Sequence, residues 1–433
     1  MDRIMASTPV FDAWADREWI LEGAAVQVSI VCFGGHAESP LHLDGQPVSN
    51  INANLSDGVD LTSARKLPGM DGIAFMGNTK GGDFDVDWVK ARRFLAAPNP
   101  HGLSNFDVVR PWVNGMDLTG HNRCKWLIDF GTDRDRSKVS CYELPFRHTE
   151  VHVRPERETN RRVSYAKYWW IHAEPRPAMR AALAGRGYTA TPNLTKYRFF
   201  VKLHGYVVPD HQLIIFTRTD DYFFGLLQSS IHELWARQQG TQLREAESGF
   251  RYTPTTCFAT FPLPWPPDSE PAENDRERPY RDAIAKVARA LDDRRGRWLN
   301  PPEWIAEIAK EIDAADDFAD VAAVSGGDAQ RLIRHAAITA QSIEDERFKK
   351  RTLTNLYNER PTWLRLATNP STKQFSPHTP RLILRAAGLL TGLTSSWRRG
   401  PGSPSPTLRT TRRTRSPSGA MRLSKQSSPT CCA

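Results

Sequence analysis

Two short runs of the chain place cationic side chains among aromatic ones, a mixture suited to contacts with nucleic acid. Residues 161–170 contain three cations and four aromatic residues, and residues 195–202 contain three of each. Arginine and lysine neutralise phosphates, while arginine and asparagine can each form two hydrogen bonds with a base edge. The candidate DNA-contacting residues in these runs, and in the polar segment before them, are Asn122, Arg123, Arg161, Arg162, Lys167, Lys196, Arg198 and Lys202. The alternative is a half-buried sheet with its charges in solvent.

The segment Asn300-Pro301-Pro302-Glu303 is close to the Asn-Pro-Pro-aromatic loop of amino-methyltransferases. In that loop the Asn side chain and a proline-fixed carbonyl accept hydrogen bonds from the target amine, and the aromatic ring stacks on the flipped base. Here Glu303 replaces the aromatic residue, and no predicted strand precedes the segment. We therefore interpret it as a helix start, with Asn300 as N-cap and Pro301 in the first turn.

No other short motif predicts a catalytic or metal site. Gly77–Gly82 lacks the P-loop spacing, and Gly34-Gly35 lacks the dinucleotide-binding pattern, so we interpret both as turns. The twelve histidines show no metal-ligand spacing, and the six cysteines form no CxxC pair. We predict no catalytic residue, no metal ligand and no disulfide, in a reducing, cytoplasmic setting.

The elements that must position the candidate residues follow a mixed α+β pattern between residues 45 and 265. Short apolar runs alternate there with Gly, Pro, Asn and Asp. Strands are predicted at 126–130, 197–203 and 213–217, and helices at 84–97, 177–186 and 224–240. Upstream, the β-branched run 24–33 predicts another strand, and residues 12–19 are interpreted as a connector with two aromatic anchors.

The remainder of the chain divides into three segments. Residues 266–279 form a polar, proline-containing linker, and residues 280–367 show apolar positions at helical spacing. The tail, 368–433, has eleven cations and no acidic residue, so we expect it to be disordered. An aberrant reading frame would produce such a tail, and a natural nucleic-acid-binding extension is the alternative.

The net charge of +9 arises in this tail and is therefore weak evidence for DNA binding. Without the eleven tail cations the chain carries 47 basic and 49 acidic residues. Only local patches can then indicate a nucleic-acid surface. No run approaches the ~20 apolar residues that a membrane helix needs, so no membrane association is predicted.

Several segments in the same order resemble MmeI-type adenine-specific DNA methyltransferases of restriction–modification systems. Residues 224–236 and 250–265 resemble the end of the family's target-recognition domain, with its Gly-(Val/Leu)-Leu-x-Ser-x-x-His helix, Arg-Tyr-(Ser/Thr) segment and closing Phe-Pro-x-Pro. Residues 105–115, 126–131 and 168–170 resemble earlier parts of that domain, and residues 350–363 resemble the helical segment after it. The resemblance spans about residues 10 to 367.

The resemblance implies an α+β organisation. Residues 1–40 would be the remnant of the catalytic domain, keeping the last strand of its methyltransferase α/β fold. Residues 45–265 would form the mixed α+β target-recognition domain, 280–367 a helical C-terminal domain and 368–433 the disordered basic tail. Arg110 then joins the candidate DNA-contacting residues, because the recognition function is expected within 105–202.

The implied function is adenine N6 methylation of a specific double-stranded DNA sequence, in restriction–modification or phage defence, with S-adenosylmethionine as cofactor. In the family, the cofactor site and the catalytic loop precede the segment that this chain matches. We therefore expect a fragment that binds no cofactor by itself and is inactive alone. The alternatives are a non-catalytic specificity protein that works with a separate catalytic chain, and a non-functional truncated product.

Overall fold

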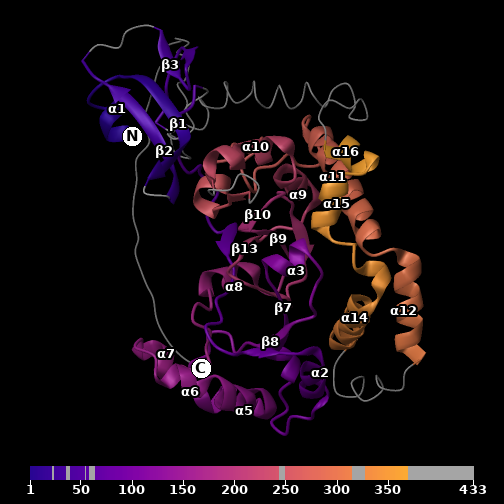
Figure 1. Ribbon diagram of the computed structural model, residues 1–433. Coiled ribbons are helices and arrows are strands. Elements are labelled where there is room, and N and C mark those ends of the chain that lie inside the picture. Colours follow the sequence, from indigo (N-terminus) through magenta and orange to yellow (C-terminus); the bar gives the residue numbers. More distant parts are fainter. Residues whose placement is uncertain are drawn as a thin grey trace, which may run out of the picture. The chain divides into compact units, whose positions relative to one another are not determined.

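The computed structural model describes residues 1–21, 24–35, 40–53, 55–57, 64–242, 249–314 and 327–368. Small sheets and helices alternate along these ranges, which confirms the predicted α+β class (Figure 1). The predicted tail lies outside the described residues, apart from its first residue, Thr368. Among the described residues, no helix is both long and apolar enough to cross a membrane.

The first sheet contains the predicted strand 24–33; its two outer strand pairs are antiparallel and its central pair is parallel. The strand order is β2-β1-β3-β4, and the short helix α1 (Asp2–Met5) precedes it. Its strands are β1 (Val10–Leu21), β2 (Ala24–Phe33), β3 (Leu41–Leu43) and β4 (Gln46–Val48). The interpretation of residues 12–19 as a connector is wrong, because they form the middle of β1. Their backbone pairs with β2 in an antiparallel hairpin, with an irregularity between Trp14 and Arg17, and no local pattern of β-branched residues indicates this pairing.

Three further sheets lie in the predicted recognition domain. Their orders are β11-β9-β13-β5, β12-β7-β8-β6 and β10-β15-β14. The strands of the first are β5 (Ala74–Met76), β9 (Tyr188–Pro192), β11 (Val201–Leu203) and β13 (Leu213–Phe216). Those of the second are β6 (Asp85–Val86), β7 (Val109–Val113), β8 (Trp126–Ile128) and β12 (Val208–Pro209). The third contains β10 (Leu194–Thr195), β14 (Thr241–Gln242) and β15 (Phe250–Arg251).

The predicted strands at 126–130 and 213–217 are confirmed as β8 and β13, whereas the one at 197–203 is reduced to β11. Every residue of β13 is buried, and the strand pairs on both sides, which explains its uninterrupted apolar run. Residues 197–200 leave the sheet, and the side chain of Arg198 turns into the interior.

Helices α2 (Trp88–Ala96) and α8 (Pro177–Leu183) confirm two of the predicted helices with shorter bounds. The predicted helix 224–240 is divided into α9 (Asp221–Leu227) and α10 (Ser230–Gln239). Ser229 makes the break, because its Oγ accepts a hydrogen bond from His232 N at 3.1 Å and caps α10. The other helices of this region are α3 (Gly115–Thr119), α4 (Arg136–Val139), α5 (Glu143–His152), α6 (Arg154–Glu158) and α7 (Val163–Lys167). Single turns occur at η1 (Asn105–Asp107) and η3 (Pro254–Phe258).

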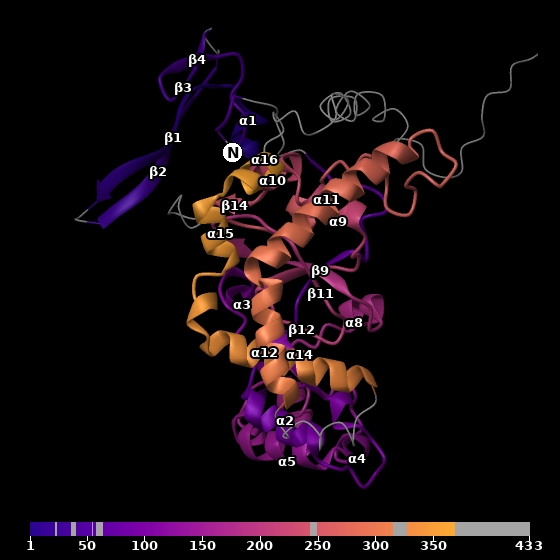
Figure 2. The ribbon, with the colours of Figure 1, turned by 90° about the vertical axis from the view of Figure 1, so that its right-hand side faces the viewer.

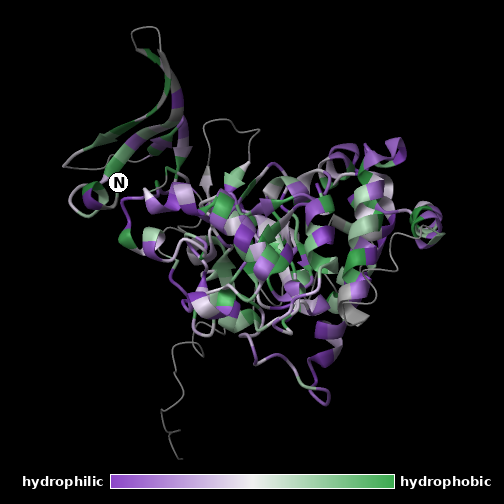
Figure 3. Cartoon of the chain, turned by 90° about the horizontal axis from the view of Figure 1, so that it is seen from below, coloured by the Kyte–Doolittle hydropathy of each residue, from purple (hydrophilic) through white to green (hydrophobic). Residues whose placement is uncertain are grey.

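The described part of the segment predicted as helical consists of helices joined by short connections. Its elements are α11 (Arg278–Leu299), α12 (Pro302–Ala314), α14 (Gly327–Glu344), η5 (Glu346–Phe348), α15 (Leu353–Glu359) and α16 (Thr362–Thr368). A helix does start at the Pro-Pro segment, as predicted. The N-cap role of Asn300 is wrong, since Asn300 closes α11 through a bond from its N to Gly296 O at 2.8 Å. Figure 3 shows hydrophilic and hydrophobic residues alternating along the helices, as amphipathic packing requires.

These C-terminal helices share their apolar core with the preceding sheets. Leu291, Leu356 and Leu364 are buried in one cluster with residues of β9 and β13. Leu332 and Ile333 of α14 are buried in another cluster with residues of β7 and β8. Figure 2 shows α11 lying over the sheet that contains β9 and β11. The two predicted domains, 45–265 and 280–367, are therefore joined by a common interior.

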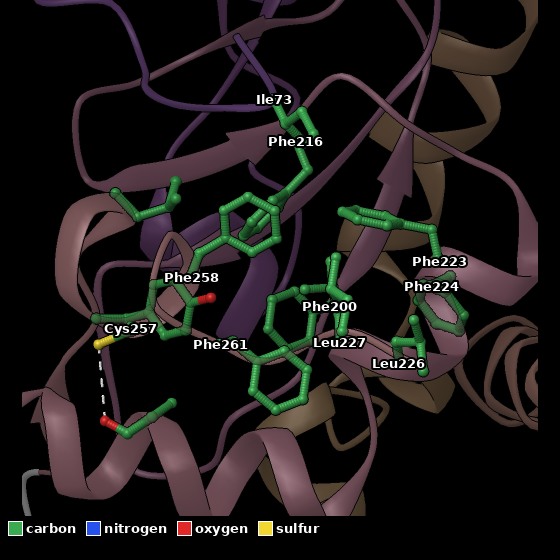
Figure 4. Close-up of a cluster of buried hydrophobic side chains, with 14 of the residues drawn as sticks. Ile73, Phe200, Phe216, Phe223, Phe224, Leu226, Leu227, Cys257, Phe258 and Phe261 are labelled. Carbon is green, nitrogen blue, oxygen red and sulfur yellow. Dashed lines mark hydrogen bonds between the residues drawn. The ribbon is translucent and has the colours of Figure 1, made fainter. Parts of the chain in front are cut away.

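An aromatic cluster lies between α9, α10 and η3 (Figure 4). Phe216 and Phe258 meet edge to face, with ring centroids 5.1 Å apart. His232 is fully buried in the same cluster, where its Nδ1 lies 2.7 Å from Leu227 O and its Nε2 lies 3.0 Å from Tyr252 Oη. Burial lowers the pKa of His232 to about 4, so the ring is neutral in the folded protein.

We expect acid to destabilise the fold through His232. In the unfolded chain the histidine takes up a proton below about pH 6.5, whereas in the folded protein it stays neutral down to its lowered pKa. The free energy of unfolding therefore falls as the pH drops from about 6.5 towards the folded pKa. The contribution approaches about 3 kcal/mol near pH 4. Urea unfolding at several pH values measures this dependence. The variant His232→Gln should show a smaller decrease in the free energy of unfolding between pH 6.5 and 4. His101→Gln, at an exposed position, should leave the slope unchanged; equal slopes for all three proteins would contradict the assignment.

Candidate nucleic-acid interface

The candidate surface is built around the short helix α7 and is called here the α7 patch. It consists of Arg134, Arg161, Arg162, Tyr165, Lys167 and Tyr168. The Tyr168 ring has the Arg134 guanidinium 5.1 Å and the Lys167 Nζ 5.3 Å from its centroid. Arg162 Nη1 donates to Tyr165 Oη at 2.7 Å. The patch thus combines exposed cations with aromatic faces, the combination that binds phosphates and stacks on bases.

Two buried side chains hold the α7 patch from below. Arg157 is 2% exposed, its guanidinium lies 4.4 Å from the Tyr165 ring centroid, and it donates to the carbonyls of Gly81 and Ile171. Burial lowers its pKa. Trp170 donates from Nε1 to Asp133 O at 2.9 Å, which fixes the loop that carries Arg134. Buried contacts therefore fix the positions of the Tyr165 ring and of the Arg134 loop, in addition to the short helix itself.

The cations of the α7 patch are not neutralised within the part of the chain that the structure describes. No ion pair to a carboxylate involves Arg134, Arg161, Arg162 or Lys167 there, and residues 159–168 contain no acidic residue. Neighbouring cations behave differently, since Arg136 and Arg154 both pair with Glu150 at 3.2 and 2.9 Å. A phosphate backbone would supply the missing counter-charge.

The second predicted run is largely built into the protein interior. Arg198 is 3% exposed and donates to Thr191 Oγ1 at 2.9 Å and to Phe250 O at 3.2 Å. Burial lowers its pKa to about 10. Its predicted role in contacting DNA is corrected to a structural one, because its donors join β9 to β15. Lys202 pairs with Asp221 at 2.5 Å and Asp292 at 3.4 Å, so its charge is also balanced internally.

The remaining predicted residues are scattered. Lys196 is exposed, with Nζ 5.4 Å from the Tyr197 ring centroid. Arg123 makes a two-pronged ion pair with Asp117, at 2.8 and 3.1 Å. Asn122 Oδ1 accepts from Cys124 N at 3.0 Å and closes a turn.

The structure thus groups Arg161, Arg162 and Lys167 of the nine predicted residues. It adds Arg134, which the sequence analysis missed because aspartates flank it on both sides. The ninth predicted residue, Arg110, lines a cavity of about 380 Å³ beside the loop that carries Arg134. Residues of η1, β7, α4 and α8 line this cavity as well. Within the described ranges, no group of three or more His, Cys, Asp or Glu residues is placed to hold a metal ion.

Comparison with known proteins gives likeness to solved structures alone. No family model matches the chain, and no curated protein sequence matches it. Among solved structures, the type IIL restriction-modification enzyme MmeI in complex with DNA matches with a TM-score of 0.50 and 18% identity. The match covers 82% of this chain and 46% of that one, so this chain spans about half of the enzyme's length. At this identity, the likeness establishes a shared fold.

Proposed function

We propose that this chain is the DNA-recognition part of a restriction–modification enzyme, and that the α7 patch contacts the phosphate backbone. The observation that carries the proposal is the group of exposed cations beside two tyrosine rings, unpaired with carboxylates in the described ranges. The shared fold with an enzyme solved in complex with DNA supports the same role. On this proposal the substrate is double-stranded DNA and the methylated base is adenine.

S-adenosylmethionine would supply the methyl group, but the described residues do not fit this cofactor. Gly34, the first of the glycine pair after β2, follows a strand of a mainly antiparallel sheet, whereas nucleotide-type cofactors bind where a parallel strand turns into a helix. Asn300 is the closing residue of α11 and does not follow a strand. We therefore assign recognition to this chain and derive no methyl-transfer step from it. A catalytic segment or a separate catalytic chain would be its partner.

Binding of the full chain to a randomised duplex library tests the proposal. We expect enrichment of a defined sequence, because base contacts add to the sequence-independent attraction of phosphates. The affinity should fall steeply with salt concentration. A chain ending at Thr368 should enrich the same sequence, which separates recognition by the body from binding by the cationic tail. Absence of duplex binding at low salt, or binding that disappears with the tail, would overturn the proposal.

A further inference from the structure

The cavity beside the α7 patch contains an arginine whose hydrogen-bonding capacity is only partly used. Arg110 Nε donates to Asp107 O at 3.2 Å, and its guanidinium lies 5.0 Å from the Phe106 ring centroid. Its two terminal nitrogens make no hydrogen bond among the described residues, although burial lowers the pKa of the group. A half-buried guanidinium therefore presents a free pair of donors to the cavity.

The other charges around the cavity are balanced in pairs. Arg180 Nη2 donates to both carboxylate oxygens of Asp129, at 2.9 and 2.8 Å, and Lys138 pairs with Asp133 at 2.7 Å. The carboxylate of Asp107, near Arg110, accepts only a long hydrogen bond, from Tyr142 Oη at 3.4 Å. The cavity thus offers two donors next to an acceptor, with no excess of positive charge that would favour a free anion.

The walls and the size of the cavity suit a flat, polar ring. Phe130, Tyr206 and Leu183 contribute apolar surface, and the volume of about 380 Å³ lies in the range of small-molecule pockets. A base with two adjacent acceptors followed by an N–H donor matches the donors of Arg110 and the carboxylate of Asp107. Cytosine has this pattern in O2, N3 and its amino group, and guanine has it in N7, O6 and N1–H. In thymine the two carbonyl acceptors flank the N3–H group and are not adjacent.

The cavity and the α7 patch share a loop. Gly131, Asp133 and Lys138 line the cavity, and Arg134 from the same stretch contacts Tyr168 of the patch. The bond from Trp170 Nε1 to Asp133 O holds this loop in place. A duplex whose phosphates lie on the patch would therefore pass directly beside the loop that lines the cavity.

We propose that the cavity binds a single guanine or cytosine rotated out of duplex DNA, with Arg110 donating to its two adjacent acceptors and Asp107 accepting from the neighbouring N–H group. The inference rests on the proposed function, since the duplex must first be held by the α7 patch. Extrusion costs unstacking energy, which is smallest for a base without a partner. A duplex that already carries an extrahelical base should therefore bind more tightly than a paired one.

Fluorescence polarisation with the full chain and four labelled duplexes tests this inference. One duplex is fully paired, and the others carry a single unpaired guanine, cytosine or thymine. We expect about tenfold tighter binding of the guanine or cytosine bulge than of the paired and thymine duplexes, the size of one good two-bond contact. Arg110→Met and Asp107→Ala should abolish this ratio while keeping the affinity for the paired duplex.

Arg161→Gln provides the matched control, because loss of a phosphate contact should weaken all four duplexes and leave the ratio unchanged. Equal binding of all duplexes, or a ratio that persists in both cavity variants, would overturn the cavity site alone. Failure to bind any duplex would instead overturn the proposed function, and with it the proposal that the cavity binds an extruded base. Free dGMP or dCMP could instead displace the labelled duplexes while no bulged duplex is preferred over the paired one. This result would assign the cavity to free nucleotides and overturn the proposal that its base comes from duplex DNA.

Discussion

Replacing Asp129 by alanine is expected to lower the free energy of unfolding by about 3–5 kcal/mol. Its carboxylate is 3% exposed and is the ion-pair partner of Arg180, and it also accepts from Gly131 N at 2.9 Å. Burial raises its pKa, but the charges of Arg180 and His172 and the hydrogen bonds outweigh this effect and lower it overall. The variant would leave Arg180 with a partly buried, unpaired charge. Urea unfolding of the parent and the variant near pH 7 measures this difference in the free energy of unfolding.

The sign of the pH effect gives a second readout. Because the pKa of Asp129 is lowered in the folded state, its contribution to the free energy of unfolding is present above the unfolded pKa near 4 and is lost as the pH falls through the folded pKa.

The double variant Asp129→Leu/Arg180→Met should recover much of the lost stability, since an apolar pair needs no counter-charge. Asp313→Ala, which breaks an exposed pair with Arg334, should change little. A double variant as unstable as Asp129→Ala would show that the ion pair is not the cause.

The triple variant Arg161→Gln/Arg162→Gln/Lys167→Gln is expected to bind duplex DNA on the order of 100-fold more weakly than the parent at 0.1 M salt. All three side chains are exposed, and none has a carboxylate partner in the described part of the chain. Each lost phosphate contact reduces the slope of log affinity against log salt by about 0.9, so the slope should fall by roughly 2.7. Polarisation titrations at four salt concentrations measure both quantities.

A charge-matched variant separates this local effect from the loss of net charge. Lys286, Arg294 and Lys310 are exposed on α11 and α12, and their replacement by glutamine removes the same three charges. This control should keep most of the affinity and a slope close to the parent's. Equal losses in the two triple variants would remove the α7 patch from the interface. Thermal unfolding of both variants checks that the fold is retained.

Local patterns were sufficient where a segment carries its own signal. The run Leu213–Phe216 is apolar at every position and forms β13, which is buried and paired on both sides. The helical spacing after residue 280 predicted α11 and the helices that follow it. The α+β class follows from such segments, because burial of one face imposes a period on the sequence that needs no knowledge of the partner.

For the candidate site, composition alone singled out the run around α7, and three of its predicted cations are exposed together there. Composition could not distinguish this run from residues 195–202, which contain as many cations, and three aromatic residues, in fewer positions. Arg198 proves to be buried against backbone carbonyls, and Lys202 is paired with Asp292, ninety residues further along the chain.

The tertiary structure alone decided which cations remain available, because exposure and ion pairing depend on residues far away in the sequence. The same holds for one edge of β1, where Asp12 and Ala13 pair with His42 and Leu43 of β3, although its other partner, β2, follows directly in the chain. It also holds for Arg134, whose neighbouring aspartates conceal it in the sequence although its guanidinium lies over Tyr168. A backbone partner or a counter-ion supplied from a distance leaves no periodic trace in the local sequence.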